Sequence, residues 1–231
     1  SNVFGFRFPI ERICALCHAY GILFCVDSAQ SAGVFDIDVG TNQYDFVCMS
    51  GHKSLYGPMG TGVLILNNRN LKPLLYGGTG TESVKKSQPE GLPEKFESGT
   101  QNMNGISGLK AGVDFVKNRG IKNIYNHEYK LAKRLFNGLA NNRKVITYNK
   151  SFDYGKVAPV VSFNIDGVYS EDLVAKLNKY GIMTRGGLHC SPLAHTTMNT
   201  IENGTVRVVP GAFNTINDIN YLLNVIRKLT N

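Results

Sequence analysis

The first third of the chain alternates between short apolar runs and polar segments. Three runs have the length of a strand: ILFCVD (22–27), YDFVCMS (44–50) and TGVLILN (61–67). Because they lack the strict alternation of a strand with one wet face, they predict a sheet that is covered on both faces. A helix is predicted over 9–20, where Pro9 occupies the favoured first turn.

A second α/β pattern follows a long polar segment. Residues 77–99 are rich in Gly, Pro, Ser and charge and predict an irregular loop, and a helical stretch follows to about residue 139, broken near Arg119-Gly120. Further strands are predicted in KVITYN, APVVSFNI and TVRVVPGAF, and further helices in SEDLVAKLNKYGI and NTINDINYLLNVIRKL. Ser170 and Asn214 are expected to cap these two helices. A domain boundary is expected between residues 125 and 145.

Composition and charge narrow the function classes. The chain has 231 residues, 42% of them apolar, which suits a packed core. No apolar run approaches the roughly 20 residues of a membrane span, and no signal-peptide pattern is visible, so we expect no membrane contact and a cytoplasmic location. The net charge is +8, but Lys and Arg are scattered over predicted helix faces. Nucleic-acid binding is therefore the weaker interpretation, and it would require salt-sensitive binding of DNA or RNA.

The five cysteines do not form a disulfide framework in the sequence. Their number is odd, and Cys25 and Cys48 lie in apolar runs, where they are predicted to be core residues. Cys14 and Cys17 form a CxxC within a predicted amphipathic helix. With no second CxxC to complete a zinc site, packing is the expected role of this pair. Cys190 stands apart, in GGLHCSPLAH, which is predicted to be a loop because Pro192 interrupts a helix.

Two chemistry-bearing segments come directly after apolar runs. DSAQ begins with Asp27 at the end of one predicted strand, and SGHK places Lys53 just beyond another. A buried carboxylate needs a cation or hydrogen bonds, and a buried lysine has a lowered pKa and becomes a usable amine nucleophile. Pyridoxal phosphate needs such a set: a lysine for its aldehyde, an acid for its ring nitrogen and donors for its phosphate.

The order of motifs resembles the class V aminotransferase group of fold type I pyridoxal-phosphate enzymes, and within it the cysteine desulfurases. The motifs are DSAQ (27–30), SGHK (50–53) with GPMGTG (57–62), ESGT (97–100), RGGLHC (185–190), GTVR (204–207) and Asn214-Thr215. The resemblance implies an α/β, fold type I transferase. Residues 1–135 would be the C-terminal part of a large cofactor-binding domain with a mostly parallel sheet, and residues 136–231 a small C-terminal α/β domain.

The resemblance also implies roles around the cofactor. Lys53 would bind the cofactor aldehyde and later move the proton of the substrate's Cα. Asp27 would hold the proton on the ring nitrogen. Gln30 would hydrogen-bond the phenolic oxygen of the ring, with Asn2 beside it.

The phosphate would be bound by a second group of residues. Ser50 and His52 would grip it within one subunit, and His52 is also a candidate catalytic residue. Thr100 would reach the phosphate of the neighbouring subunit, which implies a homodimer.

The substrate would be bound and attacked by three residues near the end of the chain. Arg207 would hold the substrate carboxylate as a bidentate fork. Arg185 would order the reactive loop or contact the substrate. Cys190 would attack the sulfur of L-cysteine, keep it as a persulfide and release L-alanine, with help from His189. An acceptor protein would then take the sulfur.

Other interpretations stay open. The same frame could serve a class V aminotransferase or a selenocysteine lyase, and the amino acid substrate would change accordingly. His189, Cys190 and His195 could be metal ligands, but no fourth partner is visible, so no metal site is predicted. The family resemblance begins about a third of the way into typical members. We therefore expect an N-terminally truncated chain that binds pyridoxal phosphate poorly, with exposed sheet edges, or a non-catalytic fragment that keeps only the fold.

Overall fold

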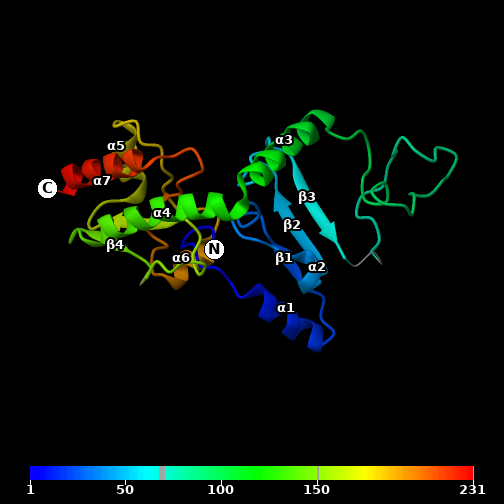
Figure 1. Ribbon diagram of the computed structural model, residues 1–231, viewed down its shortest axis with the longest axis horizontal. Helices are drawn as coiled ribbons and strands as arrows, with labels where there is room; N and C mark the ends of the chain where they lie inside the picture. Colours follow the sequence, from blue (N-terminus) through cyan, green and yellow to red (C-terminus); the bar gives the residue numbers. More distant parts are fainter. Residues whose placement is uncertain (68–70, 150, 231) are drawn as a thin grey trace. The chain divides into compact units, whose positions relative to one another are not determined.

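The computed structural model describes residues 1–67, 71–149 and 151–230. The chain forms two compact units (Figure 1), here called the strand-end unit (Ile10–Asn118) and the thiol unit (Ser1–Pro9 with Arg119–Asn231). The predicted division at residues 135/136 falls inside helix α4 (Ile121–Ala140), and the units divide at Arg119 instead. Gly120, at φ 84°, provides the break, because this backbone conformation is unfavourable for other residues.

The strand-end unit contains a three-stranded sheet with the order β1-β2-β3. Its elements are α1 (Ile10–Ala19), β1 (Cys25–Asp27), α2 (Val39–Asn42), β2 (Phe46–Ser50), β3 (Gly62–Leu66) and α3 (Met103–Arg119). Strands β1 and β2 are parallel, and β2 and β3 are antiparallel. The expectation of a mostly parallel sheet therefore holds for one of these two pairs, because the short turn after β2 reverses the chain. Residues 77–99 form a loop without helix or strand, as predicted.

Only one face of this sheet is covered in the described residues. Val26 and Val47 are buried in a cluster with Cys14 of α1 and Tyr44. Cys25 and Cys48 point to the opposite face and are exposed, so the prediction that they are core residues is wrong. Neighbouring residues of a strand face opposite sides, and only the side of Val26 and Val47 is packed.

The thiol unit contains an antiparallel sheet with the order β4-β5-β6. Its elements are α4, β4 (Val145–Thr147), β5 (Val161–Ile165), α5 (Ser170–Asn178), α6 (Pro192–Thr197), β6 (Val206–Val208) and α7 (Ile216–Thr230). All five residues of β5 are buried. Ser1–Pro9 joins this unit because Phe6 forms an antiparallel bridge with Val157. No helix among the described residues is long and apolar enough to cross a membrane.

Two local predictions in the thiol unit need correction. Pro192 does not interrupt a helix but opens α6, because a residue without an N–H fits the first turn. Ser170 does not cap α5: its hydroxyl donates to Asn203 O at 2.6 Å and accepts from Gly187 N at 3.1 Å. The tertiary contact with the Gly187 segment uses the hydroxyl that local sequence rules assign to a cap.

Candidate active site

The polar residues of the strand-end unit lie where two parallel strands end. Asp27 is the last residue of β1, and Ser50 is the last residue of β2. In the ladder Asp27 stands opposite Cys48, and the Ser28 amide donates to Cys48 O at 2.8 Å. The carboxyl ends of parallel strands form the edge at which α/β sheets bind ligands. Asp27 and Ser50 are therefore neighbours at this edge.

The turn after β2 presents the lysine. Gly57 N donates to Gly51 O at 2.8 Å, and Tyr56 N donates to Lys53 O at 2.9 Å, so the turn closes on itself. A Cβ on Gly51 would come within 2.2 Å of Thr61 Oγ1, which explains why glycine occupies this position. Lys53 is partly buried in this turn.

The donor set at this strand end fits pyridoxal phosphate. Asp27 Oδ1 accepts a hydrogen bond from Ala29 N at 2.9 Å, which fixes the carboxylate. Ser50 Oγ and His52 Nδ1 are joined at 3.1 Å, which makes a hydroxyl–imidazole pair suited to a phosphate. Lys53 adds the amine. The buried Ser28 Oγ has no hydrogen-bond partner in the described part of the chain, so this end also keeps an unused polar group.

Gln30 and Thr100 belong to the same unit and are exposed. Their predicted contacts with the cofactor stay predictions.

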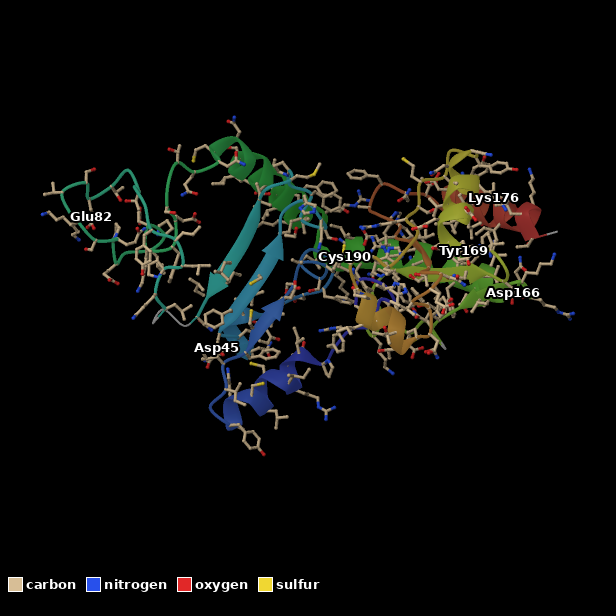
Figure 2. All side chains as sticks on the ribbon, turned by 180° about the vertical axis from the view of Figure 1, so that it is seen from behind. Asp45, Glu82, Asp166, Tyr169, Lys176 and Cys190 are labelled. Atoms are coloured by element: carbon tan, nitrogen blue, oxygen red, sulfur yellow. The ribbon has the colours of Figure 1, made fainter. Side chains whose placement is uncertain are left out.

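Cys190 of the thiol unit, labelled in Figure 2, lies close to an arginine pair. Arg185 and Arg207 form an antiparallel bridge, with Arg207 N donating to Arg185 O at 2.8 Å. Arg185 Nη2 lies 3.8 Å from Cys190 Sγ, and Cys190 is exposed. Burial, and next the charge of Arg185, lowers the pKa of Arg207. The buried Nε of Arg207 has no partner in the residues described, so this guanidinium has donor capacity left for an anion.

The histidine before Cys190 is not placed as a proton carrier for the thiol. His189 is 3% exposed, and its burial, aided by the nearby Arg207, lowers its pKa to about 4. The ring is therefore neutral at pH 7. Its Nε2 lies 2.9 Å from Thr205 O, and since a carbonyl only accepts, Nε2 carries the proton. Nδ1 is buried without a partner in the described chain, and nothing links it to Cys190.

Asn2 contacts the loop that carries Cys190, although the sequence did not indicate this position. Its Nδ2 donates to His189 O at 2.7 Å, and its Oδ1 accepts from Ser191 Oγ at 2.7 Å. Arg207 Nη1 also donates to Asn2 O, at 2.9 Å. No short sequence motif predicts contacts between residues so far apart in the chain. Ser191 was missed for the same reason.

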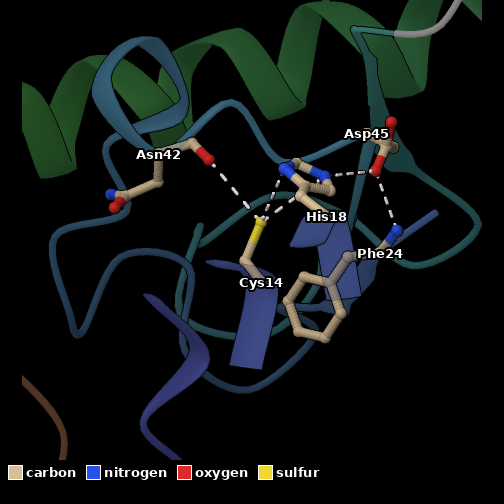
Figure 3. Close-up of polar contacts among 5 residues, drawn as sticks. All are labelled: Cys14, His18, Phe24, Asn42 and Asp45. Atoms are coloured by element: carbon tan, nitrogen blue, oxygen red, sulfur yellow. Dashed lines mark hydrogen bonds and ion pairs between the residues drawn. The ribbon is translucent and has the colours of Figure 1, made fainter. Parts of the chain in front are cut away.

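A separate thiol, imidazole and carboxylate meet in the strand-end unit (Figure 3). Cys14 Sγ lies 3.8 Å from His18 Nε2, and that nitrogen lies 2.9 Å from Asp45 Oδ2. Asp45 Oδ2 also accepts from Phe24 N at 2.8 Å. Burial, followed by the charge of Asp45, raises the pKa of Cys14, which is 2% exposed. A buried thiol with a raised pKa is a poor nucleophile, so this cluster fastens α1 to the sheet and confirms the packing role predicted for Cys14.

A family model described as aminotransferase class-V matches residues 1–222. A probable cysteine desulfurase of Pyrococcus abyssi is 35% identical over 99% of this chain and 57% of its own length. A probable cysteine desulfurase of Halalkalibacterium halodurans is also 35% identical, over 99% of this chain and 56% of its own length. The chain thus spans a little over half the length of these curated relatives.

Solved structures agree with the sequence relatives. The apo structure of a cysteine desulfurase from Thermococcus onnurineus is 34% identical, with a TM-score of 0.92 over 100% of this chain and 58% of that one. The structure of a cysteine desulfurase from Escherichia coli is 30% identical, with a TM-score of 0.87 over 99% of this chain and 56% of that one. The expected α/β, fold type I architecture is thereby confirmed.

Proposed function

The chain belongs to the class-V aminotransferase family, and from this premise we propose that the whole protein is a pyridoxal-phosphate-dependent cysteine desulfurase. It converts L-cysteine to L-alanine and leaves the sulfur as a persulfide on Cys190. The observation that carries this proposal is the exposed Cys190 thiol at 3.8 Å from Arg185 Nη2, beside the partly unpaired Arg207. The names of the similar proteins support it.

Substrate binding is assigned to the arginine pair. A guanidinium can hold a carboxylate through two parallel N–H donors. Arg207 has its Nη1 committed to Asn2 O and its Nε without a partner in the described residues, so Nε and the second terminal nitrogen form the available fork. The adjacent charge of Arg185 adds to the attraction for an anion.

The sulfur step is assigned to Cys190. Its thiolate forms an S–S bond with the sulfur of the substrate. The substrate Cβ–S bond breaks, and its electron pair stays with the carbon fragment. That fragment gains a proton and leaves as alanine, so no external oxidant or reductant is required.

The cofactor is assigned to the strand end. When bound, pyridoxal phosphate supplies an electron sink for the bonds at the substrate's Cα. Lys53 would hold the cofactor through its amine and would move the Cα proton. Asp27 would stabilise the protonated ring nitrogen, and Ser50 with His52 would hold the phosphate. The cofactor contacts of Gln30, the homodimer contact of Thr100, an acceptor protein for the sulfur and a cytoplasmic location stay predictions.

The test compares Cys190→Ala with Cys25→Ala, which removes an exposed thiol of the strand-end unit. In the whole protein, supplied with L-cysteine and pyridoxal phosphate, we expect the Cys190 variant to lose alanine release and the Cys25 variant to keep it. Mass spectrometry should find one added sulfur on the Cys190 peptide of the unaltered protein. Alanine release that survives in Cys190→Ala would contradict the proposal. A keto acid product would favour an aminotransferase, and turnover of selenocysteine alone would favour a selenocysteine lyase.

A further inference from the structure

The loop around Cys190 has a backbone that needs external support. His189 and Cys190 adopt left-handed conformations, with φ of 53° and 60°. Residues with a side chain disfavour this region, and two in succession persist only where surrounding contacts hold them. The contacts that hold this loop therefore determine where the thiol lies.

Asn2 forms hydrogen bonds with both chain neighbours of Cys190, His189 and Ser191, an arrangement called the bracket here. Its amide donates to the carbonyl of the residue before Cys190 and accepts from the hydroxyl of the residue after it, each at 2.7 Å. A single planar side chain thus fixes both neighbours of the reactive cysteine. Both polar atoms of the amide, Nδ2 and Oδ1, are used in these bonds.

Asn2 is itself held in place by a buried segment. The next residue, Val3, is fully buried, and Ser162 Oγ donates to Val3 O at 2.6 Å. Arg207 Nη1 donates to Asn2 O at 2.9 Å. The side-chain amide therefore projects from an anchored backbone, and the backbone carbonyl of Asn2 contacts the arginine of the proposed carboxylate site.

We infer that Asn2 is a positioning residue for the Cys190 thiol, which it holds through His189 O and Ser191 Oγ. The inference rests on the proposed function only in assigning sulfur transfer to the Cys190 thiol. The hydrogen bonds of Asn2 are independent of that function. It differs from the role that the sequence resemblance implies, in which Asn2 lies beside the cofactor ring. The two roles have different experimental consequences.

The decisive measurement is amide hydrogen exchange in the chain without cofactor. The Ser191 amide, which donates to Leu188 O at 2.9 Å, reports on the loop. Loss of hydrogen bonds worth about 1 to 1.5 kcal/mol predicts roughly tenfold faster exchange of this amide in Asn2→Ala. The matched control is Asn142→Ala, which removes two side-chain bonds of another asparagine in the same unit, to Thr230 and to Lys144 N. It should leave the Ser191 amide unchanged.

A double-mutant cycle separates positioning from general destabilisation. Ser191→Ala removes one arm of the bracket and should accelerate exchange of the loop less than Asn2→Ala. If the bracket acts as a unit, the double variant should exchange no faster than Asn2→Ala alone. Additive effects, uniformly faster exchange throughout the unit, or an unchanged Ser191 amide in Asn2→Ala would each overturn the inference.

A cofactor arm tests the rival role. With pyridoxal phosphate added to the whole protein, Asn2→Ala should give the same cofactor absorbance as the protein without the substitution. Loss of that absorbance with an unchanged loop would assign Asn2 to the cofactor and overturn the inference. These readouts do not depend on sulfur transfer, so the failure of the desulfurase proposal in the Cys190→Ala test would be seen separately.

Discussion

The two sheets of this protein differ in how their faces are covered. In the thiol unit every residue of β5 is buried, and Phe163 has no exposed surface. In the strand-end unit only Val26 of β1 and Val47 of β2 are buried, and Leu64 of β3 is 53% exposed. Both regions have similar apolar runs in the sequence. An apolar run therefore specifies a strand, but whether both of its faces are buried depends on which elements pack against it.

The largest expected difference between the sheets is in core truncation. Phe163→Ala should lower the free energy of unfolding by about 3 to 5 kcal/mol, because it leaves a cavity between packed layers. Leu64→Ala should change it by less than about 0.5 kcal/mol, because its side chain is already half in water. Urea unfolding, with hydrogen exchange in β5 and β3 as local probes, would measure both. Equal costs would show that the open face of the strand-end sheet is covered in solution.

A smaller difference is expected in acid. The folded-state pKa of His189 is about 4, below the ordinary value of 6.5, so the unfolded thiol unit binds more protons between these values. Stability is fully present above about pH 6.5 and falls as the pH approaches 4, by about 2 to 3 kcal/mol. In the strand-end unit, hydrogen bonds from Phe24 N and His18 lower the pKa of Asp45, so its contribution is present above the ordinary pKa of 3.8 and is lost below it.

Hydrogen exchange at pH 7 and pH 5 would measure this contrast. After correction for the intrinsic pH dependence of exchange, amides of β5 and β6 should be less protected at pH 5 than at pH 7. Amides of β2 should be equally protected at both pH values. His189→Gln, which cannot titrate, should reduce the loss in the thiol unit, and the remainder is expected from His195, whose burial also lowers the pKa of its imidazole. A thiol unit that keeps its protection at pH 5 would contradict the assigned burial of the imidazole.

The sequence predicted those parts of the candidate site that are local. Asp27, Ser50, His52 and Lys53 could be proposed because strand ends and a glycine-rich turn are visible in short segments. The bracket of Asn2 was not found, because it joins residues 187 positions apart, which meet only because Ser1–Pro9 packs into the thiol unit. Likewise Ser170 was expected to cap a helix, but its hydroxyl contacts Gly187 and Asn203. In both cases a tertiary contact uses a side chain, the Asn2 amide or the Ser170 hydroxyl, for which the sequence had predicted a different role.

The smallest expected effect is a difference in alkylation rate between thiols on the two faces of the strand-end sheet. It involves no change in the free energy of unfolding. Cys25 and Cys48 are exposed with their Sγ atoms 4.0 Å apart, whereas Cys14 on the covered face is 2% exposed. Iodoacetamide should modify Cys25 and Cys48 in the native protein well before Cys14. Partial loss of solvent around its sulfur, followed by the charge and hydrogen bond of the neighbouring Cys48, raises the pKa of Cys25. Cys48→Ala should therefore speed the alkylation of Cys25 at neutral pH, because the thiolate is the reacting form.

Peptide mass spectrometry would resolve the cysteines, and the same reaction in urea would serve as the control in which their rates converge. If Cys25 and Cys48 react as slowly as Cys14 in the native protein, another surface covers the open face. The two sheets would then be alike in burial, and the cost of Leu64→Ala should rise toward that of Phe163→Ala. Thiol labelling thus tests the same difference as core truncation, but without disturbing the packing that it measures.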